Sequence, residues 1–552
     1  MIALLLTLPL LLLSPPAGPA DPPADGPYAR ALEGLHALHE ENRALRAQLA
    51  QQNEPPPQVT VRAGDVVHVR ADEFGPMPDE PHLADWRWSF GEPDTDYNDL
   101  GGFNAAHLYA SPGEYAITLN GKPVRRVLVE ADTRPVRRVA DDRELAAAAG
   151  QGGLVVRLPP GTVAIHQTIS VAPGTAIVGD PAGTTLLWAA GAGGLIFQAE
   201  RGGATFRDIA FDSAFAEGYG KNAADAIQAG GGDVAVIECT FLNVGSGING
   251  NHRPSRVLMQ GCSAPSPTGL RSYLAWVEGE QWVFLGNSAV NSTREHIIRC
   301  AASGPGRPGV RFVLVAYNDF SNLDRRAAAE DPDESDIAKS CLIFQVGEYG
   351  WAEHNLFRGI AGVGPLGRAD GLNEPERRFR HAVFRDNRHL DTLHVDHGAE
   401  HVLIADCRFE LPRTGGDGAS SVQIEGFDAR FDRGVTDVTL RDCLLISPYR
   451  NAVQLWVQGP VAKRLALVEN TFISGGESFQ WGGMPIVIEG GWKEGVYTSS
   501  ANELPPPAGG WPDKRAFARI GDQNDAGAYL GFEGWLALPG ATRDRASDVQ
   551  VP

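Results

Sequence analysis

Short runs in which apolar and polar residues alternate recur between residues 150 and 505, separated by turns rich in Gly and Pro. The first of them reads GGLVVRLPPGTVAIHQTISVAPGTAIVGD. Alternation with a period of two residues is typical of β-strands that bury one face. We therefore predict a long series of short strands in this part of the chain.

A six-residue motif recurs in this series, with Asn, Cys or Ile at one position and in most copies an apolar residue, often Phe, two places later. The recurring positions are Ile209, Cys239, Cys262, Asn287, Asn318, Asn355, Asn387, Cys407, Cys443, Asn470 and Asn502. They are 20 to 37 residues apart, which is the length of one coil of a β-solenoid. Stacked Asn side chains can hydrogen-bond from coil to coil, and Cys fits the same column as a small buried residue. We expect an internal ladder, in which a disulfide between Cys407 and Cys443 is geometrically conceivable.

With this ladder and the turn at Leu158-Pro159-Pro160-Gly161, residues 150–505 resemble the right-handed parallel β-helix superfamily of pectate lyases and related polysaccharide enzymes. The resemblance implies an all-β fold, a right-handed parallel β-helix solenoid, for about two thirds of the chain. It implies a polysaccharide partner but no particular reaction, because one fold carries many functions.

A separate set of strand patterns covers residues 58–131. It includes WRWSFGE, in which Trp88 and Phe90 alternate inward, and HLYASPGEYAITL, with a turn at Pro112-Gly113. These motifs resemble the PKD domain, although Glu92 replaces the Asp of that family's W-x-F-G-D turn. The resemblance implies a small immunoglobulin-like β-sandwich that serves as a spacer or weak binding module before the solenoid.

The ends of the chain carry three further segments. Residues 1–20 hold an apolar run too short to span a bilayer, followed by small residues, which predicts a secretory signal peptide and a secreted, periplasmic or cell-surface protein without a membrane span. Residues 28–52 have Leu at heptad spacing, so they form either a short coiled coil that makes homo-oligomers or a single spacer helix. Residues 506–552 are expected to be a tail or a cap for the last coil.

Composition and charge exclude one fold class and argue against one class of partner. The 65 Gly and 39 Pro residues exclude a helix-rich protein, because both interrupt helices. The net charge of −20 argues against binding to nucleic acid through bulk charge.

Each coil has a second strand, and its alternation predicts one elongated exposed face. The residues predicted to bind substrate on this face are Trp276, Phe344, His394, Asp396, Glu425 and Trp456. Flat aromatic rings beside polar groups suit sugar rings. We therefore expect a groove for a polysaccharide.

The most highly charged of these strands contains Glu295, His296 and Arg299, and a long insertion ending near Lys339 follows it. A lyase for uronic acids must neutralise a carboxylate and remove the neighbouring proton, which suits these residue types. EHIIRCA and LIFQVG resemble the alginate lyase and chondroitinase B family, but Gln345 stands at that family's catalytic Arg position and its Lys position falls beside Arg299. These residue types predict β-elimination of an acidic polysaccharide, with Glu295, His296, Arg299 and Lys339 as the catalytic candidates, and Arg299 and Lys339 could replace that family's catalytic pair.

Two alternatives stay open. A glycoside hydrolase would use a carboxyl pair such as Asp396 and Glu425, and a non-catalytic carbohydrate-binding or adhesion protein would need only the aromatic face. No cofactor or metal is expected in HLDTLHVDHGAEH, because on a strand His397 would face away from His394 and Asp396. Calcium remains an option at the acidic residues of the insertion, Asp331, Asp333, Glu334 and Asp336.

Overall fold

Most of the chain beyond residue 55 is described by a computed structural model. The described residues are 56–199, 202–214, 223–250, 255–265, 270–292, 296–302, 309–323, 340–364, 378–411, 420–426, 434–447, 453–474, 484–505, 518–522, 525 and 528–545. The predicted signal peptide and the predicted helical segment at 28–52 lie outside these residues. No helix within the described ranges is long and apolar enough to cross a membrane.

Two small sheets come first. Five strands make one sheet in the order β1 (Gln58–Arg62), β7 (Lys122–Glu130), β6 (Gly113–Leu119), β3 (Arg87–Ser89) and β4 (Asp99–Gly101), and β2 (Val66–Arg70) pairs with β5 (Asn104–Leu108) in the other. Trp88, Phe90 and Tyr109 are buried between them, and the Tyr109 hydroxyl donates to the Phe90 carbonyl oxygen at 2.9 Å. The predicted inward alternation of Trp88 and Phe90 is therefore confirmed, while membership of the PKD family stays a prediction.

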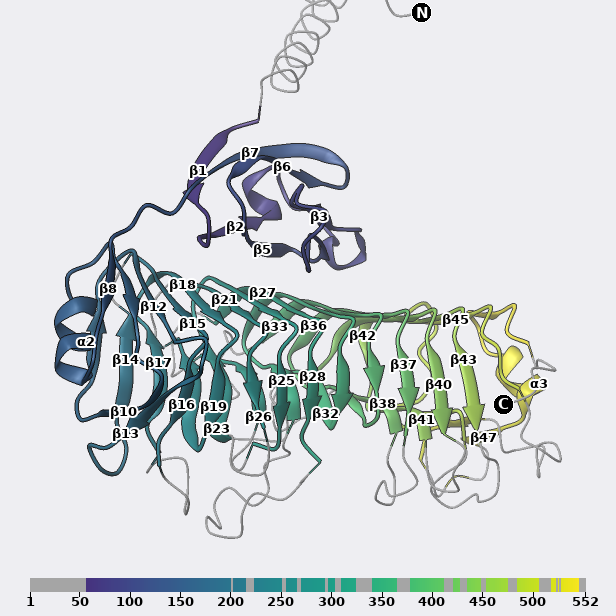
Figure 1. Cartoon of the computed structure of the whole chain (residues 1–552). Coiled ribbons are helices and arrows are strands. Elements are labelled where there is room, and N and C mark those ends of the chain that lie inside the picture. Colours follow the sequence, from purple (N-terminus) through teal and green to yellow (C-terminus); the bar gives the residue numbers. More distant parts are fainter. Residues whose placement is uncertain are drawn as a thin grey trace, which may run out of the picture. The chain divides into compact units, whose positions relative to one another are not determined.

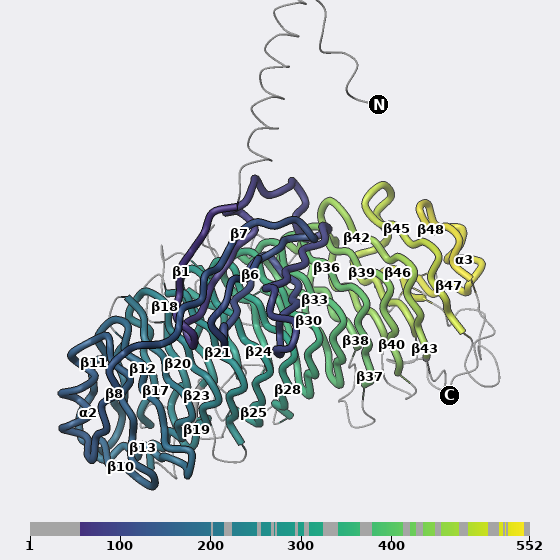
Figure 2. The backbone as a smooth tube through the Cα atoms, turned by 45° about the horizontal axis from the view of Figure 1, so that its top comes forward, coloured from purple at the N-terminus to yellow at the C-terminus, as the bar shows by residue number. Residues whose placement is uncertain are grey.

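Three long sheets follow, with 12, 14 and 15 strands among the described residues, and the chain contributes to each in turn as it coils (Figure 1). Neighbouring strands in all three sheets are parallel, apart from the pairing of β46 with β47. Successive coils stack along one axis (Figure 2). The predicted parallel β-helix is therefore confirmed.

The strands of the three sheets are short. The 12-stranded sheet contains β10 (Gly161–Ile165), β13 (Thr184–Trp188), β16 (Ala210–Asp212), β19 (Thr240–Leu242), β22 (Ser263–Ala264), β25 (Ser288–Val290), β28 (Asp319–Ser321), β31 (Leu356–Arg358), β34 (Arg388–His389), β37 (Arg408–Glu410), β40 (Leu444–Ser447) and β43 (Thr471–Ser474). The 14-stranded sheet contains β11 (Ile169–Val171), β14 (Leu195–Ala199), β17 (Asp225–Ala229), β20 (Val244–Asn249), β23 (Leu270–Val277), β26 (His296–Cys300), β29 (Ser340–Phe344), β32 (Ile360–Val363), β35 (Leu393–Val395), β38 (Ser420–Glu425), β41 (Val453–Gln458), β44 (Ile486–Ile488), β46 (Ala518–Ile520) and β47 (Tyr529–Leu530). The 15-stranded sheet contains β8 (Val136–Arg138), β9 (Val155–Arg157), β12 (Thr175–Val178), β15 (Ala204–Arg207), β18 (Gly232–Ile237), β21 (Ser255–Gln260), β24 (Gln281–Leu285), β27 (Val310–Ala316), β30 (Gly347–Glu353), β33 (Phe379–Arg385), β36 (Ala399–Ala405), β39 (Thr436–Arg441), β42 (Ala462–Val468), β45 (Tyr497–Ser500) and β48 (Ala541–Thr542).

Helices lie at both ends of the coil (Figure 1). At the first end, α2 (Asp142–Ala149) begins at Asp141, whose side chain accepts from the backbone N–H groups of Arg143 and Glu144, and it buries Leu145 in the solenoid core. At the other end, α3 (Phe532–Leu536) buries Trp535 in the same core. Both helices therefore cover apolar groups of the terminal coils.

A two-residue turn connects the 15-stranded sheet to the 12-stranded sheet in most coils. Its first residue has a left-handed backbone, at Asp208, Glu238, Tyr317, His354, Asp386, Asp406, Asp442, Glu469 and Ala501, with φ between 51° and 61°. Its second residue is the ladder residue. Because a left-handed residue reverses the chain direction locally, two residues suffice to turn the corner and aim the next side chain inward.

The predicted internal ladder is confirmed. Asn287 donates from Nδ2 to Oδ1 of Asn318 at 2.9 Å, and the same bond recurs from Asn318 to Asn355 and from Asn355 to Asn387. Each of these acceptor oxygens also receives the backbone N–H of the preceding ladder residue. The ladder thus satisfies buried backbone groups at the turn as well as the amides themselves.

All six cysteines are buried and free. Cys407 and Cys443 occupy the ladder column, as predicted, but no disulfide joins them. Their thiols donate to backbone carbonyl oxygens instead, at 3.4 Å for Cys407 to Phe384 and at 3.2 Å for Cys443 to Arg441.

The N-terminal sheets pack against the 15-stranded sheet and share an apolar cluster with it. The ring of Phe103 meets the ring of Trp351 edge to face, 5.4 Å between centroids. The fully buried carboxylate of Glu353 accepts from the backbone N–H of Gly101 at 2.5 Å and from Trp351 Nε1 at 3.1 Å. A side chain at residue 101 would collide with that carboxylate, so glycine permits the approach.

Candidate functional site

One row of side chains follows the outside of the 14-stranded sheet, one per coil, and we call it the outer row. Strand register aligns Gln198, Gln228, Asn249, Trp276, Arg299, Ile343, Gly362, His394, Gln423, Trp456, Val487 and Arg519. Their strand neighbours, such as Ala275 and Val277 beside Trp276, are buried in the core. The predicted alignment of Trp276, Arg299, His394 and Trp456 is therefore confirmed, although their function is not tested by it.

Phe344 does not belong to this face, so its predicted exposure is wrong. It pairs with Cys300, is fully buried, and stacks on Phe379 with 5.0 Å between ring centroids. Ile343 takes the outer position instead and packs against Ile360. Because this strand is apolar on both sides, alternation alone could not tell its two faces apart.

An acidic cluster lies beside the outer row and consists of Asp396, His397 and Glu425. The strand β35 ends at Val395, so Asp396 and His397 lie in a turn. The expectation that His397 faces away from Asp396 is therefore wrong, because strand alternation does not continue into a turn. His397 Nε2 lies 3.5 Å from Asp396 Oδ1 and 3.3 Å from Glu425 Oε2.

Hydrogen bonds fix the orientation of this cluster. His397 Nδ1 lies 2.9 Å from the carbonyl oxygen of Gly426, so Nδ1 carries the proton and Nε2 faces the two carboxyl groups. Gln423, in the outer row, donates from Nε2 to Glu425 Oε1 at 3.1 Å. The side chain of Glu425 is 25% exposed and that of Asp396 is 2% exposed, so the cluster reaches solvent chiefly through Glu425.

The pKa values of the two carboxyl groups are shifted in opposite directions. Burial, together with the negative charge of Glu425, raises the pKa of Asp396 to about 8. The hydrogen bond from His397 lowers the pKa of Glu425. Although burial opposes a charge on His397, its hydrogen bond to Glu425 and the charge of Asp396 raise its pKa. Near neutral pH the cluster therefore pairs a protonated Asp396 with an ionised Glu425.

A second group surrounds Arg299. Its guanidinium lies over the ring of Trp276, 4.8 Å from the centroid, and donates to Gln345 Oε1 at 3.0 Å and to the Tyr273 hydroxyl at 3.1 Å. Trp276 Nε1 donates to Glu278 Oε1 at 2.7 Å. These contacts hold the cation and the indole together on the outer row.

Of the other predicted catalytic residues, His296 lies within the described residues, and it does not join Arg299 on this row. His296 points inward, because it lies two residues before the inward-facing Ile298 on the same strand. Its side chain is 3% exposed, and its Nδ1 lies 2.7 Å from the Ser340 hydroxyl. Glu295 and Lys339 lie outside the described residues, as does the acidic insertion considered for calcium. From Arg299 to His394 the row advances three strands, roughly 14 Å. The arginine group and the acidic cluster are therefore two sites.

No family model and no curated protein matches the chain. Among solved structures, the family 28 exopolygalacturonase of Yersinia enterocolitica is 11% identical, with a TM-score of 0.37 over 90% of this chain and 100% of the other. Tailspike protein 3 of bacteriophage CBA120 is 10% identical, with a TM-score of 0.37 over 74% of this chain. The surface adhesin PfbA of Streptococcus pneumoniae is 12% identical, with a TM-score of 0.30 over 62% of this chain and 93% of the adhesin. This chain covers 58% of the tailspike's length, and similarity at this level does not establish a shared function.

Two sets of described side chains have the composition of a metal site. In the acidic cluster, Asp396, His397 and Glu425 each offer one ligand atom, and these atoms lie within 4.8 Å of one another. The other set is His82, His401 and Asp437, with its ligand atoms within the same limit. From the sequence, Asp396 and Glu425 are expected to bind substrate or to form a carboxyl pair and His397 is rejected as a metal ligand, although Gly398, with φ of 76°, marks the end of regular strand geometry there. The set of His82, His401 and Asp437 is not predicted.

Proposed function

We propose that the chain binds an extended polysaccharide along the outer row and hydrolyses it at the acidic cluster. The observation that carries this proposal is the convergence of Asp396 and Glu425 on His397, where burial raises the pKa of Asp396 and the hydrogen bond from His397 lowers the pKa of Glu425, beside a row that bears two half-buried indole groups. Pairs of carboxyl groups with separated pKa values serve glycoside hydrolysis, in which one group donates a proton and the other attacks or activates water.

The outer row has the length of a polymer site. From Trp276 to Trp456 it advances six strands, roughly 29 Å. Both indoles are half-buried, so each leaves part of its ring surface open, and the row places the acidic cluster between them. Aromatic faces bind sugar rings by apolar contact while polar neighbours bind the hydroxyl groups.

In the proposed reaction Asp396 carries the transferable proton and Glu425 provides the charged carboxylate. His397 contacts both and holds them in place, because its other nitrogen is fixed by Gly426. The candidate ligand atoms of the cluster lie within 4.8 Å of one another, which is less than the carboxyl separation of about 5–5.5 Å in retaining glycosidases and about 6.5–9.5 Å in inverting ones. The two carboxyl groups would therefore have to move apart to flank the scissile bond.

A panel of neutral and acidic polysaccharides tests the proposal. New reducing ends without ultraviolet absorbance from unsaturated uronates support hydrolysis, and their loss in Asp396→Asn and Glu425→Gln assigns it to the cluster. Binding of a glycan by the wild-type protein without either product would leave only a carbohydrate-binding function and contradict the proposal.

A second candidate is β-elimination at Arg299. The observation that favours it is a guanidinium on the outer row, stacked on Trp276, where it could neutralise the carboxylate of a uronic acid. This reaction would give unsaturated products, and Arg299→Ala would abolish them.

A further inference from the structure

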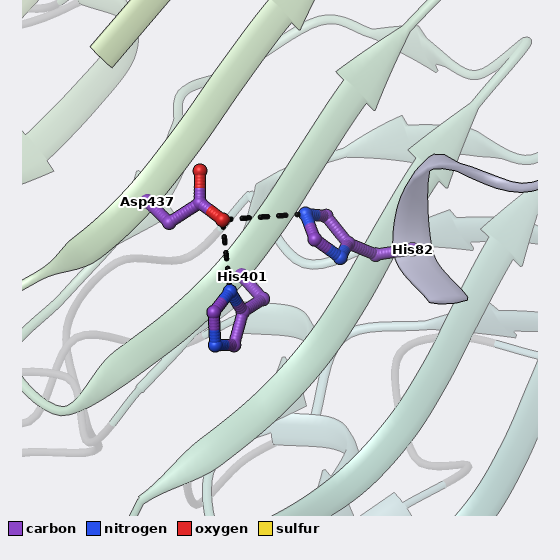
Figure 3. Close-up of side chains that lie close together, drawn as sticks. All are labelled: His82, His401 and Asp437. Atoms are coloured by element: carbon purple, nitrogen blue, oxygen red, sulfur yellow. Dashed lines mark hydrogen bonds and ion pairs between the residues drawn. The ribbon is translucent and has the colours of Figure 1, made fainter. Parts of the chain in front are cut away.

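Two histidines and an aspartate meet where the N-terminal sheets contact the solenoid (Figure 3). His82 comes from the short helix η2 (Pro81–Leu83), His401 from β36 and Asp437 from β39. Asp437 Oδ2 lies 2.8 Å from His401 Nδ1 and 3.6 Å from His82 Nε2. Three ligand-type side chains from two parts of the chain thus converge on one point.

The solenoid side of this group is built by a column of left-handed residues in the 15-stranded sheet. Phe312, Tyr349, His381, His401 and Asp437 occupy equivalent places in successive coils, with φ between 58° and 63°. The rings stack at 4.8 Å for Phe312 with Tyr349, 5.3 Å for Tyr349 with His381 and 4.9 Å for His381 with His401. Left-handed backbone at side chains other than Gly is uncommon, and its repetition gathers these groups at one place.

His82 has no hydrogen bond in this environment. It is fully buried, and neither Nδ1 nor Nε2 has a hydrogen-bond partner among the described residues. Figure 3 shows its ring directed toward Asp437 and His401. A buried polar group without a partner is costly, so a ligand that accepts the lone pair of Nε2 would remove that cost.

We propose that His82, His401 and Asp437 bind a divalent cation of the zinc class and so fasten the N-terminal sheets to the solenoid. Imidazole nitrogen and carboxylate oxygen are the ligands that zinc prefers. A tetrahedral ion with metal–ligand distances of about 2.0–2.1 Å separates its ligand atoms by about 3.3 Å. The observed 3.6 Å and 2.8 Å lie on either side of that value, so small shifts of the side chains admit the ion.

A positioning residue supports the carboxylate. Arg464 donates from Nε to Asp437 Oδ1 at 2.6 Å and from Nη2 to Oδ2 at 3.0 Å, and Nη2 also donates to Glu80 at 2.7 Å. Hydrogen-bonded partners of this kind orient metal ligands. With Oδ1 held by Arg464, Oδ2 is the oxygen directed to both histidines.

Zinc titration of the untagged full chain, after removal of bound metal with a chelator, tests the proposal. We expect one zinc per chain at this site, and binding weakened at least about tenfold by His82→Gln and by Asp437→Asn. His397→Gln is the matched control, because it alters the acidic cluster and should leave this affinity unchanged. Circular dichroism and thermal melting establish that each variant is folded.

X-ray absorption spectroscopy of the zinc-loaded wild-type protein needs no variant. Two imidazoles in the first coordination shell support the proposal, since the acidic cluster contributes only one. The absence of bound zinc, a single imidazole, or equal affinity in folded His82→Gln and wild type would overturn it.

Discussion

At the scale of single residues, the surroundings of a side chain determine its protonation more than its residue type does. Asp396 and Glu425 are both carboxylic acids, yet burial makes one a proton carrier and a hydrogen bond from His397 keeps the other ionised. The sequence places both residues near the exposed face, but their contact depends on where a strand ends. That end is set by the turn at 396–398, which alternation cannot locate.

The raised pKa of Asp396 predicts how stability changes with pH. The folded-state pKa of about 8 exceeds the ordinary value of 3.8, so the folded chain binds this proton more tightly than the unfolded chain. The stabilisation is complete below about pH 4 and is lost as pH rises through about 8. We expect Asp396→Asn to melt near the wild-type temperature at pH 5 and a few degrees above it at pH 9. Equal differences at both pH values would show that Asp396 is not protonated by its surroundings.

At the scale of strands and turns, the repeated motif predicts the contacts between neighbouring coils, but it does not predict the packing of segments that are distant in the sequence. The ladder follows from a motif whose spacing is one coil, and every amide bond predicted from Asn287 to Asn387 is present. Phe344 shows the limit, because both faces of its strand are apolar. The left-handed column that contains Asp437 could not be predicted, since its residues with φ above zero are not Gly.

The ladder predicts unequal effects of two substitutions in the same column. Asn318→Ala leaves buried backbone and amide groups without partners and should lower the free energy of unfolding by about 2–4 kcal/mol. Cys262→Ala removes only a small buried side chain and should cost about 1 kcal/mol. Denaturant unfolding of the full chain measures both changes in the free energy of unfolding. A smaller loss for Asn318→Ala than for Cys262→Ala would show that the amide ladder does not stabilise the solenoid.

At the scale of the whole molecule, the N-terminal sheets and the solenoid act as partners across a buried surface. Phe103 and Trp351 pack edge to face there, and Glu353 is buried with its hydrogen bonds satisfied from both sides. The alternation of apolar and polar residues in the N-terminal sheets and in the solenoid does not predict this interface. Each part has the pattern expected of a separate domain. The net charge of −20, by contrast, can be taken directly from composition.

Loss of the interface should appear as protease sensitivity. Phe103→Ala removes a fully buried ring, at a cost of about 3–5 kcal/mol, and should speed cleavage in the connection at 131–135. Leu323→Ala, at a side chain that is 60% exposed, is the control and should leave cleavage unchanged. Equal cleavage of Phe103→Ala and wild type would mean that Phe103 does not hold the two parts together.

The net charge predicts which glycans bind. A chain with a charge of −20 repels a polyanion, and salt screens that repulsion. Binding of an acidic polysaccharide should therefore strengthen between about 0.01 M and 0.15 M salt, while binding of a neutral one should hardly change. Affinity electrophoresis or calorimetry at the two salt concentrations measures this, and weaker binding of the acidic glycan at the higher salt would show that local cations such as Arg299 dominate.

The most direct test of the proposed hydrolysis is the turnover rate of Glu425→Gln on a polysaccharide that the wild type cleaves. Glu410→Gln is the matched control, because the Glu410 side chain is 23% exposed, close to the 25% of Glu425, and lies on the 12-stranded sheet away from the outer row. The proposed mechanism requires that Glu425→Gln lowers kcat at least about 100-fold and that Glu410→Gln stays within about twofold of the wild type. Reducing ends released by Glu425→Gln at the wild-type rate would contradict it.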